Sequence, residues 1–333
     1  MNKKKTHIII WLLLIAVLLM LPKWADLYYT SFFLTFAVFA VYAVSLNMLL
    51  GYTGLLSFGH ATYFGMGGYG TALALKNISG LSLLPAIGIG VLSASVLAIV
   101  VSPIVARVRG AAFAMIHLAL GMFMYTMSLK LRRYTGGEDG LGNFPTPGIE
   151  FFGLFSISME PSSTNFYYLA VTILGVSVLL MWFFTKTPFG QVQIAIRDNQ
   201  KRIAYLGYRI PHSRSIIYIT AGLFAGVAGS IYAVFHNLVS ADGQFGILAS
   251  FTPILASMLG GIGSFFGPIL GTGVFMIVEE IALEYTSRIE IVVGALLVFV
   301  IMFMPYGIMG FIYMLRMKWA SRRTGDLSKE AAA

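Results

Sequence analysis

The chain contains no cysteine among its 333 residues, so disulfides, thiolate metal ligands and thiol nucleophiles are excluded. Charged residues are also scarce. They make up 11% of the chain, whereas soluble domains carry about 25%. Hydrophobic residues account for 58%. So few charges cannot cover a surface that faces water, and the composition therefore indicates a protein embedded in a membrane.

The sequence also lacks the motif G-x-x-x-x-G-K-[ST], so the chain does not cradle nucleotide phosphates in the P-loop manner. Residues 65–70 match G-x-G-x-x-G, but they lie inside an apolar helical segment without the acidic residue that should follow. We interpret these glycines as sites of close helix packing. The histidines are scattered and the carboxylates do not converge. The sequence therefore predicts no catalytic residue, no metal site and no cofactor in this chain.

What the chain does have is long apolar segments. Because lipid offers no partner to exposed backbone groups, segments of about 20 apolar residues are expected to be membrane-spanning helices. Ten candidates can be marked, at residues 8–22, 31–50, 54–75, 82–106, 111–129, 166–185, 215–236, 247–259, 267–283 and 291–314. The eighth and ninth are short and are separated by glycine-rich residues, which fits either a broken helix or two short tilted spans. We expect an all-α, polytopic transmembrane helical bundle of about eight to ten spans.

Three regions are predicted: an N-terminal span and outer turn (1–30), a membrane core (31–315) and a cytoplasmic tail (316–333). The basic start and first apolar segment resemble a signal peptide. No small-x-small cleavage site follows, so we favour an uncleaved span.

Charge separates the two sides of the predicted bundle. If the N-terminus is cytoplasmic and the sides alternate, the inner connections collect 16 of the 22 Lys and Arg residues but only three of the 13 acids. Cytoplasmic connections of membrane proteins carry such an excess of Lys and Arg. This arrangement places both termini and the basic loop 186–214 in the cytoplasm, and it gives the net charge of +9 an orienting role rather than a role in nucleic-acid binding.

The basic loop contains the strongest local pattern. Residues 191–206 are good helix formers without Gly or Pro, and Gly207 is placed as a stop. Apolar residues recur at spacings of three and four, which predicts an amphipathic helix. Such a helix either rests on anionic headgroups or docks into a cytoplasmic partner.

Six stretches of the chain carry a resemblance to a known family. They are NMLLGYTGLLSFGH (47–60), GEDGL (137–141), AIRDN with AYLG (195–199 and 204–207), AGLFAGVAG (221–229), LGGIGSFFGPILG (259–271) and PYGIMG (305–310). In this order they resemble the branched-chain amino acid permease family of ABC importers. Gln200 stands where an acid is common, and Tyr306 to Ile308 replace a more usual Gly-Leu pattern.

The resemblance implies a division of labour. This chain would supply the membrane path and a second, homologous permease subunit would complete it. Two cytoplasmic ATPase subunits would bind ATP, and an external solute-binding protein would deliver the solute. The location implied is the bacterial inner membrane. The coupling residues implied are Ala195, Ile196, Arg197, Asp198, Ala204 and Gly207. Arg197 and Asp198 would contact the ATPase groove, and Ala195, Ile196 and Ala204 would pack into it.

Polar residues within the apolar runs are the candidates for the solute path. An ionisable group at membrane depth usually faces the bundle interior or a water-filled cavity. We therefore assign Asn47, Ser57 and His60 to the path. The alternative for His60 is a neutral imidazole bonded to Ser or Thr on a neighbouring helix. His117 has the same two interpretations.

Small residues at a spacing of four suggest close helix contacts in lipid. They are Gly222 with Gly226, and Gly263 with Gly267 and Gly271. They pack either within this subunit or against a second permease. Glu138 and Asp139 in the outer loop either solvate it or meet the delivery protein.

The predicted function is a permease subunit of an ATP-driven importer for branched-chain or other hydrophobic amino acids. One alternative keeps the machinery and changes the solute to urea, short amides or a sugar. Another is an ion-coupled secondary transporter, which the scarcity of acids within the spans disfavours. A third is a scaffold without transport activity.

Overall fold

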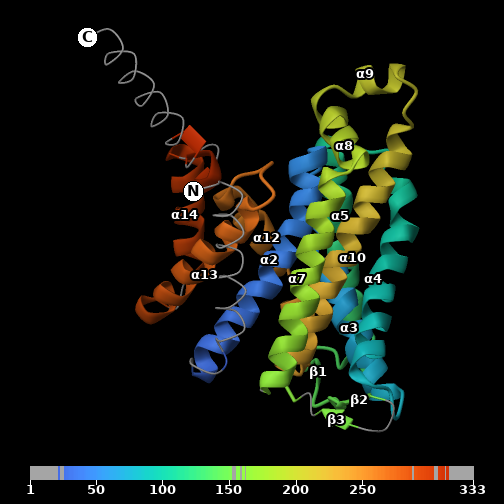
Figure 1. Ribbon diagram of the computed structural model, residues 1–333, viewed down its shortest axis with the longest axis vertical. Helices are drawn as coiled ribbons and strands as arrows, with labels where there is room; N and C mark the ends of the chain where they lie inside the picture. The colour runs from blue at the N-terminus through green and yellow to red at the C-terminus, as the bar shows by residue number, and fades with distance from the viewer. Residues whose placement is uncertain are drawn as a thin grey trace, which may run out of the picture.

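In the computed structural model, helices run between two ends of an elongated molecule (Figure 1). The structure describes residues 22, 26–151, 155–157, 160–161, 163–286, 289–303, 307–311 and 313–314. The long helices are α2 (Leu27–Thr53), α3 (Ala61–Asn77), α4 (Leu83–Val105), α5 (Gly110–Lys130), α7 (Thr164–Lys186), α10 (Ile210–His236), α12 (Ile247–Gly260), α13 (Gly267–Tyr285) and α14 (Ile289–Phe303).

Short elements join them. The short helices are α6 (Arg132–Thr135), α8 (Pro188–Asp198), α9 (Gln200–Tyr205) and α11 (Ala241–Phe245). The strands are β1 (Leu141–Gly142), β2 (Ile149–Phe151), β3 (Phe155–Ile157) and β4 (Leu238–Val239). They form two antiparallel pairs, β1 with β4 and β2 with β3.

Six segments of the described chain are long and apolar enough to cross a membrane. They are α2, α4, α5, α7, α10 and the combined stretch from α11 to α12. The all-α polytopic bundle is therefore confirmed. Of the other expected spans, α3, α13 and α14 are shorter or more charged than this criterion allows, and residues 8–22 lie outside the described part of the chain.

Two boundaries differ from the expected spans for local reasons. The third span was expected to begin at residue 54, but Gly54 adopts a left-handed conformation (φ 71°) that ends α2, and α3 begins only at Ala61. The seventh span begins five residues early, at Ile210, because Pro211 is well tolerated in the first turn of a helix.

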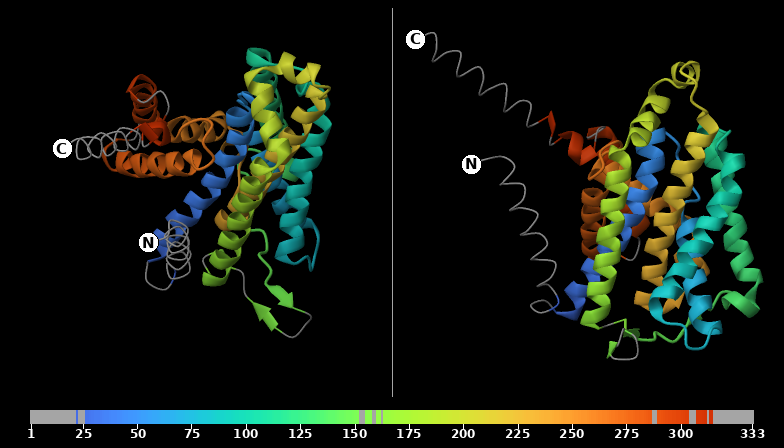
Figure 2. Two further views of the ribbon diagram at one scale, coloured as in Figure 1. Left: turned by 45° about the horizontal axis from the view of Figure 1, so that its top comes forward. Right: turned by 45° about the vertical axis from the view of Figure 1, so that its right-hand side comes forward.

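The main core lies between α2, α3, α4 and α10. Tyr42, Tyr63, Phe64 and Tyr218 are among its largest fully buried side chains. A second, smaller apolar cluster joins α12 and α13. Helices α12, α13 and α14 lie to one side of the main bundle, with α2 between the two groups, as the views of Figures 1 and 2 agree.

The two ends of the molecule differ in their connections. Helices α8 and α9 cap one end, whereas the strand pairs lie at the other (Figure 1). The connection between α4 and α5, with Arg107 and Arg109, lies at the α9 end (Figure 2). Glu138 and Asp139 belong to the loop that leads into β1 at the opposite end.

Candidate functional site

The basic loop forms two short helices instead of the single helix expected over residues 191–206. Thr187 caps α8 by accepting a hydrogen bond from the Gly190 amide at 3.4 Å. Asn199 then leaves the helical conformation, and its side chain accepts a hydrogen bond from the Arg202 amide at 3.1 Å. An Asn side chain competes with the backbone in this way at helix starts. Gly207 ends the element in a left-handed conformation (φ 87°), as expected.

The apolar stripe of this element faces the rest of the chain. Ile196 is 1% exposed and forms a cluster with Ile203 and Ile210, against which Val192 and Ala195 pack. Ile196 was expected to enter an ATPase groove. That expectation is wrong in this structure, because the stripe is buried against the start of α10.

The opposite face presents an exposed apolar tip, which we define as residues 204–208. Tyr205 is 90% exposed and Leu206 is 66% exposed, and Ala204, Gly207 and Tyr208 are exposed beside them. The sequence analysis missed Tyr205 and Leu206. The sequence did contain an indication of their role. Large apolar residues directly before a glycine in a basic loop lie outside the membrane-spanning segments, so contact with lipid does not explain them.

Arg197, which was expected at a partner surface, reaches the end of α2 while its side chain stays 38% exposed. Its Nη1 donates a hydrogen bond to the carbonyl oxygen of Gly51, and its Nε lies 3.4 Å from Oδ1 of Asp198. Gly51 is in the last turn of α2, where carbonyl groups have no donor within the helix. The guanidinium therefore caps α2 at the end where a positive charge is favourable. Asp198 itself remains exposed.

The turn between α12 and α13 meets the same end of α2. A Cβ added at Gly51 would lie 3.0 Å from the Gly263 amide nitrogen, and one added at Gly263 would lie 3.6 Å from Nη1 of Arg197. Asn47 donates from Nδ2 to the Ser264 carbonyl at 3.0 Å. Gly307 packs directly on Gly261. Four of the stretches behind the family resemblance therefore converge here, and we call this place the junction.

Buried polar side chains occur on α2 and in the segment from α2 into the first turn of α3, and we call this set the row. His60 is fully buried, and its Nε2 lies 2.9 Å from Ser45 Oγ on α2. Ser45 donates its own hydrogen to the Tyr42 carbonyl, so His60 Nε2 is the donor and Nδ1 of the neutral ring is an acceptor. The expected bond between His60 and a serine on a neighbouring helix is therefore confirmed.

Several polar atoms in this row have no protein hydrogen-bond partner. They are Asn47 Oδ1, Ser57 Oγ, His60 Nδ1 and Thr62 Oγ1. Buried polar groups are normally paired, so unpaired ones call for water or a ligand. Three of these four residues are those assigned to the solute path from the sequence.

His117 differs from His60 because both of its ring nitrogens are paired. Nδ1 lies 2.8 Å from the Phe113 carbonyl and must be the donor, so Nε2 accepts from the Tyr218 hydroxyl at 2.7 Å. Tyr63 then donates to Tyr218. Because this chain of hydrogen bonds is complete, His117 holds α5 to α10 and α3, and it offers no free atom to a solute.

The candidate packing glycines make contacts within this chain. A Cβ at Gly222 would lie 2.9 Å from Ala98 Cβ, and one at Gly226 would lie 2.5 Å from Ala94 Cβ, both on α4. Gly267 and Gly271 approach α12 in the same way. Gly263 does not continue a helix face with them, because it lies in the turn with φ 93°. Close packing within the subunit therefore accounts for Gly222, Gly226, Gly267 and Gly271, and the turn conformation accounts for Gly263.

The comparison with known proteins follows this geometry. Residues 28–304 match the model of the family described as branched-chain amino acid transport system / permease component. The chain belongs to this family. It is a transport permease and a multi-pass membrane protein of the ABC importer class.

Several named relatives share most of the permease's length. It is 25% identical over 289 residues to the high-affinity branched-chain amino acid transport system permease protein LivM of Escherichia coli (strain K12), covering 82% of this chain and 68% of that one. It is 28% identical over 299 residues to the probable branched-chain amino acid transport permease protein LivM of Methanocaldococcus jannaschii, covering 78% and 83%. For the BraD permease protein of Pseudomonas aeruginosa the identity is 24% over 293 residues, covering 82% and 92%. No solved structure matches.

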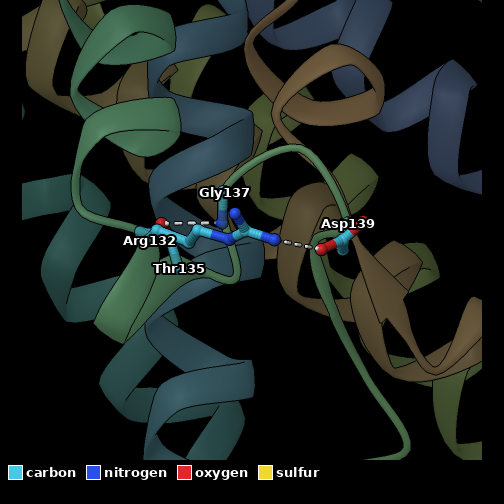
Figure 3. A network of polar contacts seen from close by, with 4 residues as sticks. All are labelled: Arg132, Thr135, Gly137 and Asp139. Atoms are coloured by element: carbon cyan, nitrogen blue, oxygen red, sulfur yellow. Dashed lines mark hydrogen bonds and ion pairs between the residues drawn. The ribbon is translucent and has the colours of Figure 1, made fainter.

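At the strand end of the permease, the loop between α6 and β1 contains a small polar network (Figure 3). Arg132 Nη2 pairs with Asp139 Oδ2 at 3.0 Å, and the Gly137 amide donates to Thr135 Oγ1 at 3.4 Å. Glu138 is exposed beside this pair. Of the two acids singled out in the sequence, Asp139 therefore pairs with Arg132 within the loop, and Glu138 remains open to solvent. No group of three His, Asp or Glu side chains suited to a metal occurs within the described ranges.

Proposed function

We propose that the permease is one of two membrane subunits of an ATP-driven importer for branched-chain or other hydrophobic amino acids. The observation that carries this proposal is the family match over residues 28–304, together with relatives whose names specify branched-chain amino acid transport. In this proposal two cytoplasmic ATPase subunits bind the ATP, a homologous permease completes the path, and an external protein delivers the solute.

The proposed orientation puts α8 and α9 in the cytoplasm of a bacterial inner membrane, with both termini on that side. The excess of Lys and Arg in the connections at this end supports it. The lack of cysteine allows a direct test. A single Lys201→Cys variant should react with a membrane-impermeant maleimide in inside-out vesicles and remain unlabelled in intact cells. The opposite labelling pattern would reverse the orientation.

The ATPase contact is assigned to the exposed tip. An apolar tip at this end lies beyond the long apolar helices and is not covered by the rest of the described chain, which supports a protein partner. Ala204 and Gly207 remain contact residues in this proposal, and Tyr205 and Leu206 join them. Exposed aromatic side chains of this kind often contribute most of the binding energy of an interface.

The solute path is assigned to the row of buried polar groups. Asn47 Oδ1 and His60 Nδ1 are acceptors, and an acceptor suits the ammonium group of an amino acid. Ser57 Oγ is able to donate to a carboxylate. A solute shifts an alternating-access equilibrium only by binding its two states unequally. The free polar atoms of this row are therefore the groups expected to pair in one state and not in the other.

Reconstitution tests the whole assignment. The permease, its partner permease, the ATPase subunits and the binding protein are incorporated into proteoliposomes, and ATP hydrolysis is measured with leucine, urea or ribose. Leucine is expected to stimulate hydrolysis and to accumulate in the direction of import. Stimulation by urea or ribose alone would change the solute class. Uptake driven by an ion gradient without the ATPases would replace the importer with a secondary transporter.

A further inference from the structure

Arg197 joins an element at the membrane surface to the interior of the bundle. Its backbone belongs to α8, whereas its guanidinium donates to the Gly51 carbonyl at the end of α2, 146 positions away in sequence. The last turn of α2 contains no basic residue of its own. Because a hydrogen bond from a charged donor is stronger and more directional than a neutral one, this contact holds α8 and α2 in a fixed relation.

The same side chain lies against the turn between α12 and α13. Gly54 and Gly263 leave the room it occupies, since a Cβ at Gly54 would be 3.2 Å from Arg197 Cγ. Both glycines have positive φ angles, 71° and 93°, so other residues would be strained there. Two of the stretches that carry the family resemblance, 47–60 and 259–271, therefore meet around one guanidinium.

The turn is tied on one side and open on the other. Asn47 binds it through the Ser264 carbonyl at 3.0 Å. Its other side borders an open hollow of about 530 Å³, lined also by Met309, Gly310 and Tyr313. The turn therefore borders open space on this side, while Arg197 and Asn47 join its other side to α8 and α2.

The tip and Arg197 belong to different helices of the connection between α7 and α10. Arg197 is in α8, and the tip begins in α9. Asn199 separates α9 from α8, and α8 is anchored to α10 through a hydrogen bond of 3.1 Å from Gln193 Nε2 to the Ser213 carbonyl. Arg197 lies outside the tip. The tip leads into α10 on one side, where Arg214 donates to Gln200 Oε1 at 3.1 Å, and it is joined to α8 on the other side through α9.

We propose that Arg197 is a positioning residue that transmits movement of α8 to the end of α2 and to the turn between α12 and α13, and that it is not an ATPase contact. This inference rests on the proposed function. It predicts that loss of the guanidinium uncouples ATP hydrolysis from transport while the ATPase subunits remain bound. A docking residue would instead lose the ATPase when it is changed.

The test uses the complete reconstituted complex with Arg197→Met, and Arg202→Met is the matched control. Both variants remove one positive charge from an exposed side chain of the same connection, but of the two only Arg197 donates to the Gly51 carbonyl of α2. Two quantities are measured: the amount of ATPase that co-purifies with the permease, and the ATP hydrolysed per leucine transported. For Arg197→Met we expect unchanged co-purification and a ratio about tenfold higher, within the usual range of coupling between sites. Arg202→Met should hydrolyse as much ATP per leucine transported as the complex without substitutions.

Three results would overturn the inference. Loss of the ATPase from Arg197→Met would make Arg197 a docking residue, and an unchanged ratio would leave it without a role in coupling. If the unchanged complex shows no leucine-stimulated hydrolysis, the proposed function fails and the inference fails with it. If Arg197→Met does not insert, Arg197→Lys provides the same measurement. In this variant a compact ammonium group replaces the planar guanidinium donor. We therefore expect the ATP hydrolysed per leucine transported to rise at least about twofold, and an unchanged value contradicts the inference.

Discussion

The contact between α10 and α4 at Gly226 allows a quantitative prediction. A Cβ added there would lie 2.5 Å from Ala94 Cβ, whereas carbon atoms pack best at about 3.5–4.0 Å. The two helices would have to separate by about 1 Å. On its other side α10 is in contact with α3, because Gly67 packs on the Gly226 carbonyl. Helix α10 therefore has no free direction in which to move.

Two effects oppose each other when Gly226 is replaced by Ala. Replacing Gly inside a helix stabilises it by about 0.5–1 kcal/mol, whereas an extra carbon in a packed core costs about 1–3 kcal/mol. Gly175 in α7 isolates the first effect, because its added Cβ would have open space within 4 Å. We therefore expect Gly226→Ala to be less stable than Gly175→Ala by about 1–3 kcal/mol.

The assay is thermal unfolding of the purified permease in detergent, with the two variants compared under identical conditions. For a chain of 333 residues, a difference of about 2 kcal/mol corresponds to a midpoint lower by about 3 °C. Ala94→Gly, combined with Gly226→Ala, removes the opposing methyl group and should recover part of the loss, since neighbouring sites couple. Equal midpoints for Gly226→Ala and Gly175→Ala, or no recovery in the double variant, would refute the proposed packing.

The remaining predictions concern the tip, the two histidines and the outer loop. Tyr205→Ser should weaken ATPase co-purification by about 30-fold, as loss of an interface hot spot of about 2 kcal/mol does, whereas Tyr285→Ser, at a tyrosine that is 83% exposed but lies outside the tip, should not. His117→Ala leaves the Tyr218 network incomplete and should lower the unfolding free energy by about 1–3 kcal/mol. His60→Ala should instead change leucine-stimulated hydrolysis more than stability, and equal effects of the two histidine variants on both readouts would contradict the distinction. Arg132→Ala breaks an ion pair whose side chains are 76% and 78% exposed, so its unfolding free energy should match that of the unchanged protein to within about 0.5 kcal/mol, and a larger loss would contradict the small contribution expected of an exposed pair.

The sequence predicted those features that follow from composition or from one residue's own chemistry. Long apolar segments must be helices in lipid, and most expected spans correspond to described helices. Gly207 ends its helix because it tolerates the left-handed conformation. His60 required a polar partner, and serine on the adjacent helix was the expected kind.

What the sequence could not predict depends on contacts between distant segments or on competition within a turn. The direction of Arg197 is set by an unpaired carbonyl on α2, and nothing near residue 197 reveals it. The break at Asn199 reflects competition between a side chain and the backbone, which helix propensity alone does not resolve. Gly263 matched a helical spacing by coincidence, because the turn that contains it is defined by contacts with α2.

The non-helical residue Asn199 has a consequence for how such a transporter can evolve. Binding of the ATPase subunit is assigned to the tip after Asn199, and transmission of its movement is assigned to Arg197 before Asn199. Substitutions at Tyr205 or Leu206 could fit the permease to another nucleotide-hydrolysing subunit while α8 and the contact of Arg197 with α2 stay unchanged. Partner choice and mechanical output are therefore free to change independently.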